Sequence, residues 1–455
     1  MGSFRSAVTK AALFGSGLVL SFGSTGRLTI AQAPPAASPA SSSPAVAFDA
    51  SLDPWVKKLG DSHFRQRELA SQTLRKAGAP ALACLRKSVN DPDPEIRQRV
   101  LELVSEIEAS IQMEPKRVTL RETNKSAKDV LAALAKTSGY PIDLWNDPGG
   151  PISIACVDKP FWEVIDQISE KSGLTLQQNY GDDRVRLSQT GVAPRYVDYS
   201  GPFRISAQSI QQHKVVDLAA GREARRSETL SLQLVVFSEP RMPILGLGEA
   251  KLVSAFDSEG NSLIPPSPAA TGEGGFRGRS VSRYGNGYRM LSMQSSVALR
   301  RQNDRAKEAA LIKGTVLATL LAQQDRIVLS ENIMTEKGKK LEASNMTFLV
   351  EQVGKSPNGG LELKLTISDK SKDPSDMTWM NSLMQRIEVK DKSGAKLVPN
   401  GTNWHQSGQN FVQISFTFSP PNGKAEKDPK YELIFQNWKT VDQLVSFELR
   451  NIPLP

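Results

Sequence analysis

Cysteine and histidine are scarce in this 455-residue chain, which contains two cysteines and three histidines. The histidines lie in three different segments, and none has a cysteine or a second histidine at the spacing that metal ligands require. We therefore expect no metal site. The cysteines lie among apolar neighbours, which is typical of buried free thiols rather than of a disulfide framework. These five residues are His63, His213, His405, Cys84 and Cys156.

Short catalytic motifs are missing as well. The sequence has no nucleophile elbow, no Walker A loop, no HExxH helix and no CxxC pair. The glycine-rich stretch TGEGGFRGRS precedes no convincing helix, so we do not expect it to bind phosphate. Asp257, Glu259 and Asp391 fit solvated turns better than calcium ligands or paired acids, because Gly, Ser and Lys fill most of the neighbouring positions. We expect no catalytic residue and no cofactor, so the chain is not predicted to be an enzyme.

The charge balance is only mildly basic. The chain has 57 Lys and Arg residues against 48 Asp and Glu residues, a net charge of +9. Three positive charges and no acid lie in residues 1–33, so the remainder carries about +6. Basic clusters such as Arg222–Arg226 and Lys337–Lys340 fit solvated loops or strand edges. We expect no nucleic-acid partner.

The first 50 residues have the composition of an export signal and a linker. Arg5 and Lys10 precede a short apolar run, and Ala31-Gln32-Ala33 offers small residues for cleavage. We predict a signal peptide over residues 1–33, a Pro/Ala/Ser linker over 34–50, and no integral membrane span after signal removal. The expected location is the periplasm, the cell surface or the medium, and a retained N-terminal anchor is the alternative.

Residues 51–112 have a helical pattern. Asp93 can cap a helix that begins at Pro94, and the apolar residues that follow it have helical spacing. The phrase DPDPEIRQRVLELV and the helix–turn–helix spacing resemble HEAT-type helical repeats. Only about one and a half repeats are present, fewer than the three that usually stand alone. We expect this segment to pack against the next module or a partner.

A short motif occurs twice within residues 117–188, with a period of 34 residues. Val118 and Leu120 in RVTL correspond to Ile152 and Ile154 in ISIA. Each copy predicts a strand, a helix and a second strand. Ser126 and Asp129 predict a capping box at the start of the first helix, and Gly139 and Gly173 predict the ends of the two helices.

The second copy resembles the small N-terminal domains of secretins and TonB-dependent receptors. The pattern of those domains is matched by Asp158, Pro160, Val164, Ile165, Ile168, Gly173 and Leu174. The resemblance implies a small α/β module over residues 113–192 and a place in the bacterial cell envelope. The chain lacks the long amphipathic strands of an outer-membrane barrel, so it is not predicted to be a secretin or a receptor itself.

From residue 200 onward, short alternating runs separated by Gly, Asn, Asp and Pro predict strands. The phrase AFDSEGNSL recurs as VKDKSGAKL, and in each copy Asp and Gly predict a hairpin tip. We predict two antiparallel, immunoglobulin-like β-sandwiches, over residues 200–328 and 329–455. The expected fold class is therefore multidomain α+β, with a helical-repeat segment, a duplicated βαβ module and two sandwiches.

Two features are candidates for a binding surface. Trp404 and His405 lie in the polar phrase GTNWHQSGQN, where an aromatic side chain could anchor a sugar or a protein. A basic stretch supplies Arg277, Arg279, Arg283 and Arg289. The leading hypothesis is a non-enzymatic interaction or assembly protein that binds other envelope proteins, by strand pairing or by sandwich loops. The alternatives are a protein that binds cell-wall polysaccharide or peptidoglycan, and an envelope hydrolase.

Overall fold

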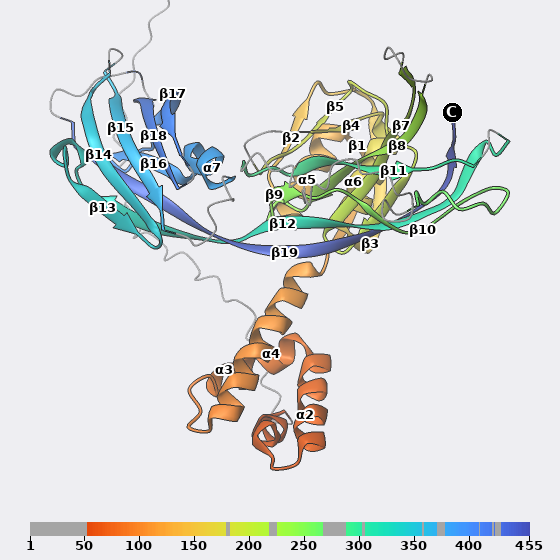
Figure 1. Cartoon of the computed structure of the whole chain (residues 1–455), viewed down its shortest axis with the longest axis horizontal. Coiled ribbons are helices and arrows are strands. Elements are labelled where there is room, and N and C mark those ends of the chain that lie inside the picture. The colour runs from red at the N-terminus through yellow and green to blue at the C-terminus, as the bar shows by residue number, and fades with distance from the viewer. Residues whose placement is uncertain are drawn as a thin grey trace, which may run out of the picture.

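A computed structural model describes residues 52–178, 183–217, 225–266, 288–302, 305–356, 359–370, 378–408, 410–420, 423 and 429–455. The expected signal peptide and linker lie outside this range, as do Arg277, Arg279 and Arg283. The described chain is an α+β protein with several antiparallel sheets (Figure 1). None of its helices is both long enough and apolar enough to cross a membrane.

The N-terminal segment is helical. Its helices are α1 (Asp53–Lys57), the 3-10 turn η1 (Lys58–Gly60), α2 (Phe64–Ala77), α3 (Ala79–Lys87) and α4 (Pro94–Met113). The predicted cap of α4 is confirmed, because the Asp93 side chain accepts a hydrogen bond from the backbone N–H of Glu95. Gly78, at a positive φ of 63°, separates α2 from α3.

The helical segment stands apart from the rest of the molecule (Figure 1). Its buried residues form a core of their own, and within the described residues it meets the β-rich part at the end of α4. There, Arg241 donates a hydrogen bond to the carbonyl oxygen of Glu114, and Met113 packs against the first β-sandwich core. The neighbouring α/β module therefore does not cover the helices of this segment. A binding partner remains the expected cover.

The duplicated segment forms a compact α/β module. Its elements are β1 (Arg117–Ser126), α5 (Ala127–Ser138), β2 (Ile142–Trp145), β3 (Pro151–Pro160), α6 (Phe161–Ser172), β4 (Thr175–Gln177) and β5 (Val185–Ser188). The first strands of the two copies, β1 and β3, pair antiparallel with each other, and β5 pairs with β2 and β4. The predicted caps are confirmed: the Ser126 hydroxyl accepts from the N–H of Asp129, and Gly139 and Gly173 end the helices in the left-handed conformation.

The remaining strands build two lobes. The first lobe contains β6 (Val197–Ser200), β7 (Phe203–Asp217), β8 (Arg225–Ser238), β9 (Ile244–Leu247), β10 (Lys251–Asp257), β11 (Ser292–Leu299) and part of β12 (Glu308–Ser330). The second lobe contains η3 (Ile333–Thr335), β13 (Lys340–Ala343), β14 (Met346–Lys355), β15 (Leu361–Asp369), α7 (Thr378–Arg386), β16 (Ile387–Asp391), β17 (Val398–Ser407), β18 (Phe411–Ser419) and part of β19 (Tyr431–Pro453).

The two lobes share one sheet. Strands β12 and β19 pair antiparallel from Glu308↔Pro453 to Ser330↔Leu433, and Figure 1 shows them running through both lobes. The first half of β12 and the second half of β19 contribute to the first core, whereas the start of β19 contributes to the second core. The expected boundary at residue 328 falls inside β12, and the C-terminal residues of the chain return to the first lobe. Strand β12 therefore runs from the first lobe into the second, and β19 runs from the second lobe back into the first.

The two lobes also repeat the same strand order. The outer sheet is β11-β8-β7-β6 in the first lobe and β18-β15-β14-β13 in the second, where β17 adds a further edge strand. The shared sheet has the order β10-β12-β19-β16, so β10 and β16 occupy its opposite ends. The repeated AFDSEGNSL and VKDKSGAKL phrases begin in the last residues of these two strands, and Gly260 and Gly394 take positive φ values of 84° and 82° at the predicted hairpin tips. The sequence echo thus marks equivalent turns of a duplicated lobe.

The shared sheet leads to a test with two residues of β19. Phe447 is buried against Gly314 in the first core, whereas Leu444, three residues earlier, is 62% exposed. We expect Phe447→Ala to lower the free energy of unfolding by about 3–5 kcal/mol, because it removes a buried ring. Leu444→Ala should change it by less than about 0.5 kcal/mol. Urea unfolding of the two variants measures the difference, and similar losses would contradict the packing of β19 in the first lobe.

Candidate functional site

The structure places Trp404 and His405 on β17, at the edge of the outer sheet of the second lobe. Trp404 pairs with Ile414 on the core side of the sheet and is 44% exposed. His405 lies at a register shift, and its Nε2 is 2.7 Å from the Ser415 hydroxyl. Since Ser415 and Ile414 are neighbours in a strand and point to opposite faces, Trp404 and His405 do not share one surface.

Arg289 lies beside the α/β module, away from the β17 edge that carries Trp404 and His405. Its guanidinium lies 2.9 Å from the carboxylate of Asp183 in the α/β module, and its side chain is 26% exposed. Its backbone N–H donates a hydrogen bond to the Gln385 side chain on α7. Arg289 therefore joins the module, the first lobe and the second lobe at one point, which is a structural role. The structure does not bring Arg289 together with Trp404 or His405.

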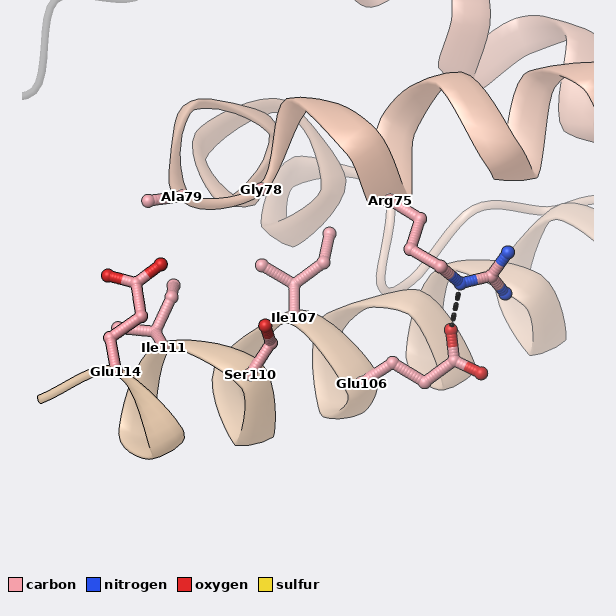
Figure 2. A pocket seen from close by; sticks show the side chains of 8 residues that line it. All are labelled: Arg75, Gly78, Ala79, Glu106, Ile107, Ser110, Ile111 and Glu114. Carbon is pink, nitrogen blue, oxygen red and sulfur yellow. Dashed lines mark hydrogen bonds and ion pairs between the residues drawn. The ribbon is translucent and has the colours of Figure 1, made fainter. Parts of the chain in front are cut away.

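A groove on the helical segment was not predicted from the sequence. It lies between α4 and the corner where α2 meets α3, and its volume is about 220 Å³ (Figure 2). Ile107 and Ile111 of α4 face Gly78 and Ala79 across it. The groove exists because α4 has 20 residues and α3 only nine, lengths of about 30 Å and about 14 Å. The last turns of α4 thus extend past the beginning of α3.

The two ends of the groove differ in charge. At one end, Arg75 Nε is 2.7 Å from Glu106 Oε2, and this ion pair closes the groove between α2 and α4 (Figure 2). Both side chains are half exposed, so the pair adds little to stability. Ser110 lies between Ile107 and Ile111 along α4, and Glu114 lies at the other end. The groove therefore offers an apolar floor with an ion pair at one end and the Glu114 carboxylate at the other, and the Glu114 end suits an apolar side chain next to a positive charge.

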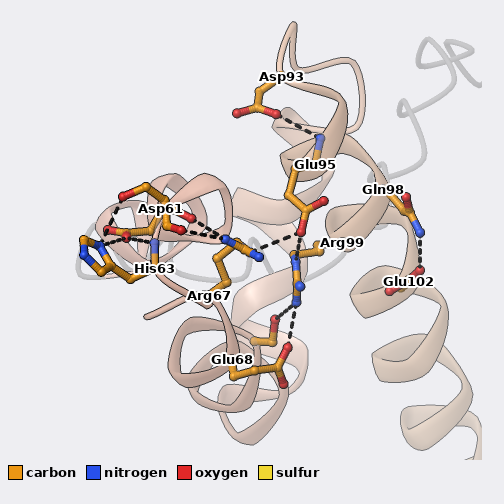
Figure 3. Close-up of polar contacts among 11 residues, drawn as sticks. Asp61, His63, Arg67, Glu68, Asp93, Glu95, Gln98, Arg99 and Glu102 are labelled. Carbon is orange, nitrogen blue, oxygen red and sulfur yellow. Dashed lines mark hydrogen bonds and ion pairs between the residues drawn. The ribbon is translucent and has the colours of Figure 1, made fainter. Parts of the chain in front are cut away.

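A polar network joins α2 to α4 near the start of both helices (Figure 3). Arg99 of α4 contacts Glu95 at 2.7 Å and Glu68 of α2 at 2.9 Å, and hydrogen bonds to these carboxylates raise the pKa of Arg99. Arg67 of α2 lies 3.2 Å from Glu95 and donates to the carbonyl oxygen of Asp61. The network fixes α2 against α4 at the end of these helices that lies away from the groove.

The α/β module is fastened to the first lobe by a buried acid. Glu239, directly after β8, accepts hydrogen bonds from the Tyr140 hydroxyl and the Lys116 backbone N–H, both at 2.7 Å, and lies 3.1 Å from Arg241. Burial raises the pKa of Glu239 despite these contacts, and it also raises the pKa of Tyr140. Trp162 of the module adds a hydrogen bond to the carbonyl oxygen of Pro202. This network positions the module rather than forming an open site.

No family model matches the chain, and no curated protein or solved structure matches it either. Within the described ranges, no group of three or more His, Cys, Asp or Glu side chains is placed to hold a metal ion. Both cysteines are free and buried.

The raised pKa of Glu239 predicts a pH-dependent effect of Glu239→Gln. The folded protein holds the Glu239 proton more tightly than the unfolded chain does, so this residue lowers the free energy of unfolding as the pH rises through its folded pKa. Glutamine cannot ionise and lacks this dependence. We expect the stability lost on substitution to be larger at about pH 5 than at about pH 7.5, in unfolding curves at both values. An equal loss at both would show that Glu239 does not titrate differently on folding.

Proposed function

We propose that this chain is an exported, non-enzymatic interaction protein of the bacterial cell envelope, in which the helical segment recognises a partner protein. Export rests on the signal-like composition of residues 1–33, and the envelope location on the resemblance of the α/β module to secretin and receptor domains. We also infer that residues 51–112 are HEAT-like, residues 113–192 are secretin-like and the two lobes are immunoglobulin-like.

The groove along α4 is the observation that carries this proposal. Its apolar floor is formed by Ile107 and Ile111, and a volume of about 220 Å³ has room for one large side chain. Helical surfaces commonly bind partners by accepting such an anchor, and a desolvated anchor supplies much of the binding energy. The Arg99 network ties α2 to α4, and a fixed arrangement of these two helices lowers the entropic cost of binding between them.

The placement of the helical segment supports the same function. Within the described ranges it joins the lobes at the end of α4, so its surface is accessible on the sides that face away from the lobes (Figure 1). A partner can approach it without displacing the α/β module. The sandwiches and the module then serve as a platform that holds the recognition segment at a fixed position.

Site-specific photocrosslinking in cells tests the proposal. A photoreactive phenylalanine derivative at Ser110, beside the groove, should form an adduct with an envelope protein. The matched control has the same photoreactive derivative in place of Gln112, which is exposed on another side of α4. It should not form that adduct. Ile111→Arg should abolish the Ser110 adduct, because it fills the groove with a charged side chain.

Thermal unfolding of the Ile111→Arg protein must show that the helical segment is still folded. Absence of any adduct at Ser110 would contradict the proposal. The same adducts at Ser110 and Gln112, or an adduct that survives Ile111→Arg, would also contradict it, because the contact would then not depend on the groove.

A further inference from the structure

A second hollow lies on the outer sheet of the first lobe, where the cover of the α/β module ends. Its volume is about 380 Å³. Three neighbouring strands contribute its polar side chains, which are Gln208, Ser209 and Gln211 of β7, Gln233 of β8 and Gln294 of β11. We call this hollow the glutamine trough. It lies far along the chain from the residues of the α4 groove and is independent of it.

The strand geometry explains the trough. On β8, Val235 and Phe237 point outward and pack under the α/β module, whereas Gln233 lies beyond that cover. The register of β7 against β8 shifts between Ala207 and Ser209, and such a bulge bends a strand and redirects its side chains. On the other side of β7, β6 pairs only with residues 203–206, so the trough opens past that edge.

The lining is uncharged but rich in hydrogen-bonding groups. None of its described lining residues is acidic or basic. Gln294 donates to the Gln178 side chain of the module at 3.2 Å, and Gln208 donates to the Ser206 hydroxyl at 3.1 Å. The Gln211 and Gln233 amides have no hydrogen-bond partner within the part of the chain that the structure describes. Each of these amides therefore offers both donors and an acceptor to a ligand.

The second lobe shows that this lining is not a general property of the fold. On the corresponding sheet, Glu351 of β14 accepts hydrogen bonds from Thr366 of β15 and Gln413 of β18, and it lies 3.7 Å from Lys364. The outward polar groups of that lobe thus satisfy one another, and contact with Thr366 lowers the pKa of Glu351. In the first lobe, the equivalent strands carry neutral amides that do not pair across the sheet in this way.

We propose that the glutamine trough binds an uncharged oligosaccharide. Side-chain amides match hydroxyl and acetamido groups, because each partner both donates and accepts hydrogen bonds. Neighbouring strands are about 4.8 Å apart, so amides on β7, β8 and β11 can contact successive parts of one sugar chain. The lack of charge disfavours a nucleic acid or an acidic polymer, which basic side chains would bind. This site is distinct from Trp404 and from the basic stretch 277–289.

Calorimetric titration of the full chain with chitohexaose and cellohexaose tests the proposal. We expect saturable binding of at least one of these neutral oligosaccharides, with an affinity that changes less than about twofold when the salt concentration is raised. Replacing both Gln211 and Gln233 by alanine should weaken binding by about twentyfold, since each amide contributes one or more hydrogen bonds. Both residues are solvent-facing, so the variant should keep its unfolding temperature.

Gln413→Ala, on the corresponding sheet of the second lobe, is the matched control and should leave the affinity unchanged. Trp404→Ala should also leave it unchanged, which separates the trough from the β17 edge. Absence of binding of both oligosaccharides at about 10 mM would overturn the proposal. Binding that survives the double substitution, or that Trp404→Ala abolishes, would overturn it as well.

Discussion

The pairing of β12 with β19 is the constraint on which the rest of the structure depends. Each of these 23-residue strands begins in one lobe and ends in the other, so each sandwich core contains a strand from its neighbour. Between the cores, the ribbon is polar, and Lys439 lies 3.1 Å from Asp325 across it. Two hydrogen-bonded strands resist twisting more than a single flexible linker does. The relative position of the lobes is thus built into the strand pairing.

The first lobe, in turn, positions the α/β module. Part of its outer sheet is buried on both faces, because Val235 and Phe237 of β8 face the module while the residues that alternate with them face the sandwich core. A buried carboxylate at Glu239 ties the module down, and breaking such a buried contact on one side is costly. The same arrangement leaves part of the outer sheet uncovered. The glutamine trough lies where the cover of the module ends, so its shape depends on how the module packs on the sheet.

Local features of this fold could be predicted from the sequence, and distant pairings could not. Ser126, Gly139 and Gly173 cap helices through contacts within a few residues, and their patterns were sufficient. The return of β19 to the first lobe and the bond between Tyr140 and Glu239 join residues about 100 to 145 positions apart, and neither leaves a local signal. For the candidate sites, sequence reasoning chose conspicuous aromatic and basic residues. The α4 groove and the trough depend instead on helix lengths and on a bulge.

The duplication of the lobes offers a way to separate structural from functional features. Elements that both lobes share, such as the outer four-stranded order and the Asp–Gly hairpins, are needed to build the sandwich. Elements that differ are not required by the fold. The second lobe has the additional edge strand β17. The outward side chains of its outer sheet form a charged network around Glu351. The first lobe has instead a long β7–β8 hairpin and a neutral, amide-lined face. Because one architecture tolerates both surfaces, the amide lining does not follow from packing, and ligand binding explains it better than stability does.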